Sequence, residues 1–517
     1  MNPTELAAPC GTVHGSLERG VHVFRGIAYA LPPVGSLRFA PPQPAPPVQH
    51  IDATRFGAIS LQDIDPLPEV LPGAEHNFYA TGSRTDEDCL TLNVWTADPA
   101  GAAPVYVYIH GGGFLCGSGT GDWIDGANLA RELGIVVVTV NYRLGLLGNL
   151  WLGDHDPMAS NLAIQDDIQA LRWVRDNIAA FGGDPSNVTV GGESAGALST
   201  LALLCAPAAQ GLFQRAVVES GHLGLFQSVL DARRATEIVL RDLHIDARDD
   251  VLARLRETST LRIAAVQRRH GIALGCFPLV ADGTIIDADP VRALGAGWAR
   301  DVALLIGSNA EEDRLFRLTG WAPPTRSVAE AADALLTSED ARGTAIRLYE
   351  GVQAEGQLGT GEIDSLMATD QAWAEPVRAT ALAHGSAGGR TYHYQLGWRS
   401  SVPGVGAAHL VDVPFFFGNL EQPGVTALLG DEVRTDPATR VLASATSASL
   451  AQFVRTGDLA HGPLGPWPTY TESERWTMVL DRRSHLERDN LADRLDFWAA
   501  HRDEAASPLA STTGGLQ

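Results

Sequence analysis

The sequence predicts an α/β fold, with a central, mostly parallel sheet that is flanked by helices on both faces. Three short β-branched runs, residues 105–109, 135–140 and 188–190, alternate with segments of helical character. Between residues 164 and 178, isoleucine, leucine and valine recur at helical spacing, which is typical of a helix whose apolar stripe packs against a sheet. Hydrophobic residues make up 45% of the chain, enough for a sizeable core.

The strongest single motif is the pentapeptide Gly192-Glu193-Ser194-Ala195-Gly196. A strand-like run, residues 187–190, comes directly before it, and an alanine- and leucine-rich segment, residues 195–204, follows as a predicted helix. A serine on a sharp strand-to-helix turn is the context of a nucleophile elbow, where flanking glycines let the backbone pass close to itself. Ser194 is therefore the candidate catalytic nucleophile.

A second motif, His110-Gly111-Gly112-Gly113-Phe114, follows the strand-like run at 105–109. Such a loop can aim backbone N–H groups at a carbonyl oxygen that becomes an oxyanion, and glycines leave room for the substrate. Taken alone, the motif could equally be a flexible glycine turn. Together with the elbow downstream, it favours an oxyanion loop and an α/β-hydrolase fold with large helical insertions.

Serine needs a base that a third group orients, and in α/β-hydrolases these follow in the chain order serine, acid, histidine. A predicted strand at 302–307 leads into three adjacent carboxylates, Glu311, Glu312 and Asp313, among which composition does not choose. Of the 15 histidines, His409 is favoured as the base by its position after these acids and by its glycine-rich loop.

The motifs resemble, in their order along the chain, the type-B carboxylesterases, the family that also contains the cholinesterases. The resemblance runs from near residue 11 to about residue 470. Beyond the elbow, it rests on Phe24-Arg25-Gly26-Ile27-Ala28-Tyr29, Pro32-Pro33-Val34-Gly35-Ser36-Leu37-Arg38-Phe39, Glu87-Asp88-Cys89-Leu90-Thr91-Leu92-Asn93-Val94-Trp95, Asn141-Tyr142-Arg143-Leu144-Gly145, Phe181-Gly182-Gly183-Asp184-Pro185, Gly457-Asp458 and Trp467-Pro468.

This resemblance implies which carboxylate is the catalytic acid. The family carries a loop similar to Gly-Thr-Asn-x-Asp-Glu-Gly, and residues 307–313 match it so that the acid falls on Glu312. Two positions depart from the pattern, because Glu311 stands where Asp is usual and Asp313 where Gly is usual. Both are expected to face solvent or other partners and to tolerate amide substitution. His409 falls on the family's catalytic histidine.

The resemblance also implies the oxyanion donors, which fall on the backbone N–H groups of Gly112, Gly113 and Ala195. Ser220 matches a serine that supports the acid, although an ordinary serine at a strand end would look the same.

Two buried ion pairs are implied in the same way: Arg38 with Glu87, and Arg143 with Asp166. Arginine suits a carboxylate through its planar fork. The alternative is a set of separate surface charges, which would contribute little to stability.

The cysteines indicate a reducing compartment, because an odd, sparse set is not a disulfide framework. Many secreted relatives pair the cysteine at position 89 with one upstream, but Ser60 occupies the partner position, so Cys89 is expected to be a free thiol. The N-terminus lacks the features of a signal peptide and no apolar run reaches membrane-spanning length, so a cytoplasmic protein is expected. The five cysteines are Cys10, Cys89, Cys116, Cys205 and Cys276.

The formal net charge of −23 argues against nucleic acid and anionic membranes as partners. No metal-ligand spacing and no phosphate-binding loop is found, so neither a metal nor an organic cofactor is expected, and the oligomeric state cannot be read. Residues 1–505 are expected to form one catalytic domain, because one site spreads from Ser194 to His409. The polar tail, residues 506–517, is expected to be disordered.

These expectations describe a serine carboxylesterase. Two alternatives stay open: cleavage of carbamates or amides at the same site, and a non-catalytic binding protein of the same fold. Choline esters are not expected as substrates, because residues 72–86 lack the tryptophan that cholinesterase-like members carry there. Four aromatic residues could line the substrate pocket or simply belong to the core: Trp123, Phe316, Trp321 and Trp398.

Overall fold

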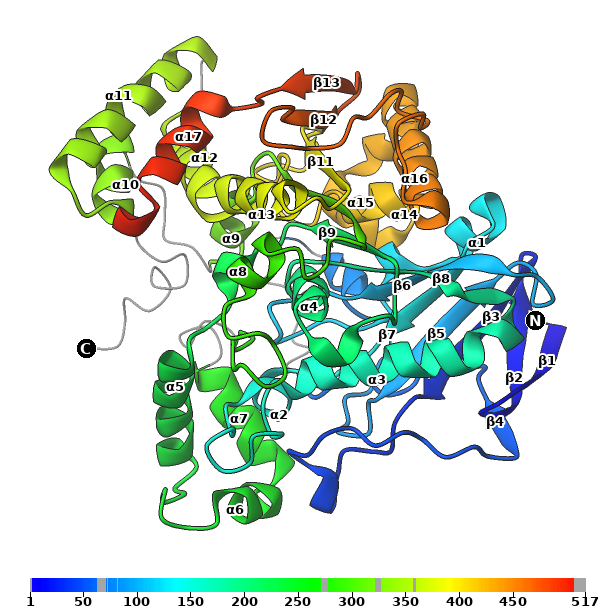
Figure 1. Ribbon diagram of the computed structural model, residues 1–517. Helices are drawn as coiled ribbons and strands as arrows, with labels where there is room; N and C mark the ends of the chain where they lie inside the picture. Colours follow the sequence, from blue (N-terminus) through cyan, green and yellow to red (C-terminus); the bar gives the residue numbers. More distant parts are fainter. Residues whose placement is uncertain are drawn as a thin grey trace.

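The computed structural model describes residues 2–62, 71, 73–80, 82–270, 278–320, 327–356 and 359–505. Within these residues, 13 strands form one sheet (Figure 1). The strands are β1 (Asn2–Ala8), β2 (Gly11–Glu18), β3 (Val21–Ala28), β4 (His50–Asp52), β5 (Thr91–Thr96), β6 (Ala103–Ile109), β7 (Val136–Val140), β8 (Gly183–Glu193), β9 (Arg215–Glu219), β10 (Ala303–Asn309), β11 (Thr391–Leu396), β12 (Trp476–Leu480) and β13 (His485–Arg488).

The strand order is β1-β2-β3-β5-β7-β6-β8-β9-β10-β11-β12-β13, with β4 paired to β2. From β7 to β12 every neighbouring pair is parallel, whereas β1, β2, β3, β5 and β13 pair antiparallel at the two edges. The five residues of β7 are all buried and read Val-Val-Val-Thr-Val, as expected of a strand covered on both faces. The predicted mostly parallel sheet is therefore confirmed.

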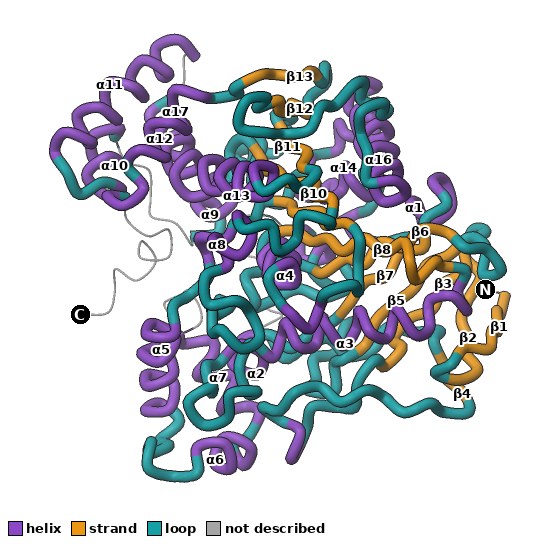
Figure 2. The backbone as a smooth tube through the Cα atoms, viewed as in Figure 1, coloured by secondary structure: helices purple, strands orange, loops and turns teal. Residues whose placement is uncertain are grey.

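Helices cover both faces of the sheet, and Figure 2 shows the strands running between them. The helices are α1 (Ala127–Leu133), α2 (Gly145–Asn149), α3 (Leu162–Asn177), α4 (Ala195–Leu204), α5 (Val229–Asp242), α6 (Val251–Glu257), α7 (Thr260–His270), α8 (Pro290–Gly295), α9 (Asp313–Leu318), α10 (Val328–Leu335), α11 (Glu339–Gly356), α12 (Thr360–Thr369), α13 (Glu375–Ser386), α14 (Val413–Phe417), α15 (Pro423–Leu429), α16 (Pro437–Thr456) and α17 (Ala492–Ala500).

Strand β6 shows how the two layers arise, because successive side chains of a strand point to opposite faces. Val105, Val107 and Ile109 belong to the core that contains the apolar stripe of α3 together with α4 and α13. Tyr106 and Tyr108 belong to the core on the other face, with α1, α14 and α16. The helical stripe predicted between residues 164 and 178 is thus confirmed as core packing.

The insertions form two further small cores away from the sheet. Helices α5, α6 and α7 pack with α2 around one of them, and α10, α11 and α12 pack with the C-terminal helix α17 around the other. Figure 1 shows these groups as two helical lobes on the same side of the molecule. Helix α17 therefore joins the end of the described chain to an insertion more than 100 residues earlier in the sequence.

The predicted site lies at the carboxyl edge of the parallel strands, where active sites of α/β sheets form. Four neighbouring strands end there at Ile109, Glu193, Glu219 and Asn309, and the motif-bearing loops follow directly. Helix α4 begins right after Ser194 and has the predicted bounds.

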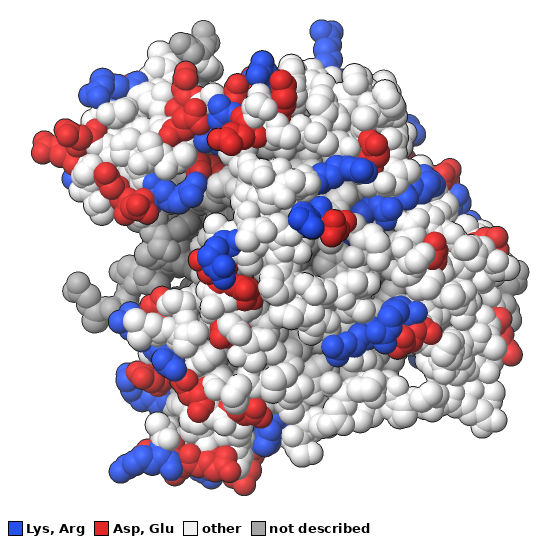
Figure 3. Space-filling model, in the orientation of Figure 1, with Lys and Arg blue, Asp and Glu red and all other residues white. Residues whose placement is uncertain are grey.

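On the face shown in Figure 3, basic and acidic side chains lie next to one another over α5, α6, α10 and α11, so the excess of acidic residues does not make one continuous patch there. Among the described residues, no helix combines the length and the apolar character needed to cross a membrane. The predicted tail, residues 506–517, lies outside the described residues.

Candidate active site

Ser194 sits in a strained backbone conformation between β8 and α4. Its φ of 55° and ψ of −118° lie in a region that non-glycine residues rarely adopt. Its N–H donates to the carbonyl of Glu219 at the end of β9, 2.9 Å away. Strain of this kind costs about 1–3 kcal/mol, persists only where the surroundings enforce it, and clusters at functional sites.

The two elbow glycines allow the turn because the backbone passes against β6. A Cβ atom on Gly192 would lie 2.4 Å from the carbonyl oxygen of Ile109, and one on Gly196 would lie 2.0 Å from the same oxygen. Both distances are far below van der Waals contact. The sequence prediction that these glycines permit a close backbone approach is therefore confirmed.

The glycine loop after β6 lies against the elbow. A Cβ atom on Gly111 would lie 2.5 Å from Glu193 Oε2 and 3.2 Å from the Cβ atom of Ser194. Gly112 and Gly113 have φ angles of 106° and 62°, which favour glycine, and the Gly112 carbonyl closes the loop by accepting the N–H of Cys116 at 3.1 Å.

The backbone N–H groups of the three predicted oxyanion donors are not occupied by acceptors within the described structure. Within the described part of the chain, the N–H groups of Gly112 and Gly113 make no hydrogen bond. Ala195 is the first residue of α4, and the N–H of a first helical residue has no intrahelical acceptor. All three groups are thus available to a ligand oxygen.

Glu312 and His409 meet although 97 positions separate them in sequence. His409 Nδ1 lies 2.5 Å from Glu312 Oε2, and both side chains are buried. The other carboxylate oxygen, Oε1, accepts from the Ser220 hydroxyl at 2.5 Å and from the Asn309 N–H at 2.6 Å. The contact of Ser220 with Glu312 agrees with the family resemblance, whereas Asn309 matches the asparagine of the family loop but had no role predicted for it.

Glu193, the residue before Ser194, also contacts His409. His409 Nε2 lies 3.0 Å from Glu193 Oε1, close enough for an ion pair although not aligned as a good hydrogen bond. Burial alone would lower the pKa of His409, but the charges of Glu193 and Glu312 outweigh it and raise this pKa to about 10. Burial raises the pKa of Glu193 to about 7, against the lowering effect of His409.

Two more buried carboxyl groups lie in the same interior region. Asp412 accepts hydrogen bonds from the Tyr394 hydroxyl at 2.7 Å and from the Asn309 amide at 3.0 Å, and Glu219 lies 3.5 Å from the Tyr106 hydroxyl. Burial, as the largest cause, raises the pKa of both carboxyl groups. Both carboxyl groups therefore lie in surroundings that disfavour their charged form.

An aromatic pair covers the imidazole of His409. The ring centroids of Phe316 and Trp373 lie 5.0 and 4.7 Å from that of His409, and the two rings stack on each other. Trp373 was not predicted from the sequence. It lies on a π-helical turn, Asp370–Ala374, between α12 and α13.

Of the other three aromatic residues considered for the pocket, two belong to the core. Trp398 is fully buried against Phe415 and belongs to the core, as does Trp123 against Phe78. Trp321 lies outside the described residues.

The two carboxylates next to Glu312 do not face solvent. Asp313 is buried and pairs with Arg317, and Glu311 is largely buried beside Arg314. The expectation that these carboxylates face either solvent or other partners is resolved in favour of partners, because helix α9 places an arginine one turn after each of them.

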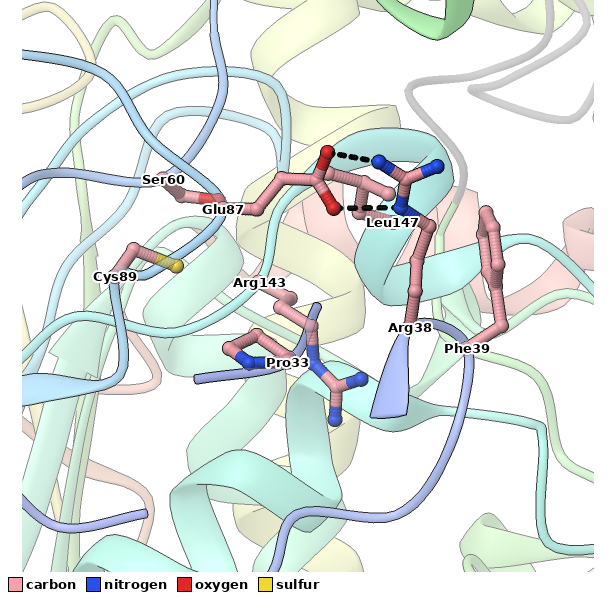
Figure 4. A pocket seen from close by; sticks show the side chains of 8 residues that line it. All are labelled: Pro33, Arg38, Phe39, Ser60, Glu87, Cys89, Arg143 and Leu147. Atoms are coloured by element: carbon pink, nitrogen blue, oxygen red, sulfur yellow. Dashed lines mark hydrogen bonds and ion pairs between the residues drawn. The ribbon is translucent and has the colours of Figure 1, made fainter. Parts of the chain in front are cut away.

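Both predicted ion pairs are confirmed. Arg38 Nη2 lies 2.5 Å from Glu87 Oε1, and its Nε donates to the second oxygen at 2.6 Å, as Figure 4 shows. Arg143 binds Asp166 through Nη2 at 2.7 Å and Nε at 2.8 Å, again as a fork. The first pair joins two of the early motifs to each other, and the second joins the Asn141–Gly145 motif to helix α3.

Cys89 is a free thiol in the described structure, as predicted. It lies near Ser60 in the interior region drawn in Figure 4, and Ser60 accepts the N–H of Leu144 at 3.0 Å. Burial is the main reason that the pKa of the Cys89 thiol is raised to about 12, so this thiol is inert in the folded protein.

The parallel sheet, the strained serine between β8 and α4 and the glycine loop beside it define an α/β-hydrolase. The model of the carboxylesterase family matches residues 2–498. Para-nitrobenzyl esterase of Bacillus subtilis is 35% identical, over 93% of this chain and 95% of that protein.

A second relative and a solved structure agree with this family assignment. A probable N-octanoylanthranilate hydrolase of Rhodococcus erythropolis is 33% identical over 92% of this chain and 97% of that protein. The structure of the Geobacillus stearothermophilus carboxylesterase EST55 matches with a TM-score of 0.80 and 33% identity, covering 96% of this chain and all of that one. The chain therefore belongs to the carboxylesterase family and is a carboxylic ester hydrolase.

Proposed function

We propose that the protein is a serine carboxylesterase that hydrolyses small-molecule esters through an acyl-enzyme intermediate. The observation that carries this proposal is the buried hydrogen bond of 2.5 Å between Glu312 and His409, beside the strained elbow that presents Ser194. In this assignment Ser194 is the nucleophile, His409 the base and Glu312 the acid that orients the imidazole.

The reaction begins when Ser194 Oγ attacks the ester carbonyl and His409 Nε2 takes its proton. The N–H groups of Gly112, Gly113 and Ala195 bind the oxyanion, a contribution of ~3 kcal/mol per donor to the activation free energy. His409 then protonates the departing alkoxide, and a water molecule activated by the same nitrogen releases the acid.

Glu193 affects the first step, because it touches the nitrogen that must accept the proton. When Glu193 is ionised it favours the imidazolium, which cannot act as a base. When it is protonated, or when substrate displaces the contact, the neutral imidazole is free to turn toward the serine hydroxyl. Hydrogen bonds in active sites without ligand are commonly longer or less aligned than in the reacting complex.

Amide cleavage at the same site is the second candidate. It is favoured by the similarity to the probable N-octanoylanthranilate hydrolase, whose name denotes cleavage of an N-acyl group. The same nucleophile, base and oxyanion donors serve both reactions, and only the leaving group differs.

The decisive experiment compares p-nitrophenyl esters of graded acyl length with their matched anilides and carbamates, using wild type and Ser194→Ala. Wild type is expected to hydrolyse the esters fastest. The variant should fold but lose about a million-fold in kcat.

A fluorophosphonate probe should label wild type and leave Ser194→Ala unlabelled. Residual turnover of the variant within tenfold of wild type would place the nucleophile elsewhere. A wild-type protein that the probe does not label would contradict an activated serine nucleophile at this site.

A further inference from the structure

A reciprocal pair of hydrogen bonds joins the loop of the acid to the loop of the base. The N–H of Glu311 donates to the carbonyl of Ala407 at 2.9 Å, and the N–H of Ala407 donates to the side-chain Oε2 of Glu311 at 2.9 Å. Glu311 immediately precedes Glu312, and Ala407 lies two residues before His409. The two residues therefore meet beside the hydrogen bond between Glu312 and His409.

Two arginines hold the Glu311 carboxylate in place from the other side. Its Oε1 accepts from Arg314 Nε at 2.7 Å and lies 3.0 Å from Arg399 Nη1. The same two arginines also bind Glu362, at 2.8 and 3.3 Å. The Glu311 side chain is only 12% exposed, so its orientation is set by these contacts and not by solvent.

Gly406 shows how closely the base loop approaches this carboxylate. Its φ is 60°, and a Cβ atom there would lie 2.5 Å from Glu311 Oε2 and 2.9 Å from Arg314 Cδ. The glycine that precedes Ala407 therefore lets the loop come within hydrogen-bond distance of Glu311.

A cavity of about 190 Å³ lies beside the contact, and Ala310, Glu311 and Ala407 line it together with Glu362 and Arg399. Loops that border empty space can shift when a hydrogen bond between them is removed.

We propose that Glu311 is a positioning residue, whose side chain sets the distance between the loop of Glu312 and the loop of His409. This inference rests on the proposed function, in which His409 is the base and Glu312 its partner. Without the carboxylate, the Ala407 N–H loses its acceptor in a largely buried place, which is unfavourable unless the loop moves. The loop that moves carries the base.

The test compares Glu311→Ala with Glu362→Gln on a p-nitrophenyl ester. Displacement of a reacting group by about 1 Å can cost about 100-fold, so Glu311→Ala is expected to lose 10- to 100-fold in kcat while KM changes less than about threefold. Glu362→Gln is the matched control, because it weakens contacts to the same arginines but does not touch Ala407. It should keep kcat within about threefold of wild type.

Glu311→Asp retains the charge, and aspartate is the usual family residue at this position. This variant is expected to retain most of the kcat that Glu311→Ala loses. Glu311→Gln keeps the side-chain size and one oxygen that can accept the Ala407 N–H, so it is expected to lose less than about tenfold in kcat; if the alanine protein does not fold, a larger loss in Glu311→Gln would contradict the role of the acceptor. The low-field proton NMR signal of the imidazole N–H bound to Glu312 should shift or broaden in Glu311→Ala and remain in Glu362→Gln.

Equal kcat in Glu311→Ala and wild type would overturn the proposal. So would an equal loss in Glu362→Gln, since the effect would then belong to the charge network as a whole. An unchanged NMR signal in Glu311→Ala would likewise contradict it. Fluorophosphonate labelling of wild type separates these outcomes from failure of the proposed esterase function, which would abolish labelling in the parent protein.

Discussion

Replacing Arg143 with methionine should destabilise the protein strongly, because it leaves a buried carboxylate without its partner. The side chains of Arg143 and Asp166 are 3% and 0% exposed. The change removes both hydrogen bonds of the fork and a third, from Nη1 to the carbonyl of Ala40 at 2.8 Å. Among the described residues, Asp166 then keeps one hydrogen bond, from the backbone N–H of residue 143 at 3.1 Å. Breaking one side of a buried pair costs about 3–5 kcal/mol.

The assay is urea unfolding followed by tryptophan fluorescence, with recovery of the signal on dilution checked first. Arg175→Met is the matched control: Arg175 lies on α3, the helix that carries Asp166, and pairs with Asp176, but these side chains are 54% and 55% exposed. Its loss should stay below about 1 kcal/mol.

The double variant Arg143→Met with Asp166→Leu should regain much of the stability, because no charge remains buried without a partner. Two results would refute the reasoning: equal unfolding midpoints for Arg143→Met and Arg175→Met, or a double variant less stable than Arg143→Met.

Two further predictions concern the site, and a third concerns the buried Cys89. Glu312→Gln should keep the shape but remove the charge beside the imidazole, lowering kcat roughly 10⁴-fold in steady-state assays by analogy with another triad; a loss below tenfold would assign the acid elsewhere. Because the pKa of His409 is raised above its usual 6.5 and the base must be neutral, kcat/KM should decrease as the pH is lowered, with a midpoint above pH 6.5. Glu193→Gln removes a charge that raises this pKa and should move the midpoint to lower pH; a move to higher pH would contradict the effect of the contact. Cys89 should react with a thiol reagent after unfolding without reductant, and a native disulfide found by mass spectrometry would disprove the free thiol opposite Ser60.

The local elements could be predicted because their causes are local. The β-branched run of β7 and the apolar stripe of α3 determine burial on both faces of a sheet through residues close in sequence. The elbow around Ser194 is equally local, since a strand, a tight turn and a helix follow one another within about 20 residues. The acid was different: adjacent carboxylates look alike in composition, and only the family resemblance singled out Glu312.

The sequence by itself thus determined the fold class, the elbow that carries the candidate nucleophile and the glycine loop, because each depends on a short run of residues. Only the tertiary structure decided which side chains, distant in sequence, come into contact around His409. It placed Glu193 against His409, stacked Trp373 on the same imidazole and turned Glu311 toward Ala407. The physical reason is that strand pairing and loop closure bring together residues that are far apart in sequence: Glu311 and Ala407 are separated by 96 positions, and Glu193 and His409 by 216. No local pattern encodes such contacts.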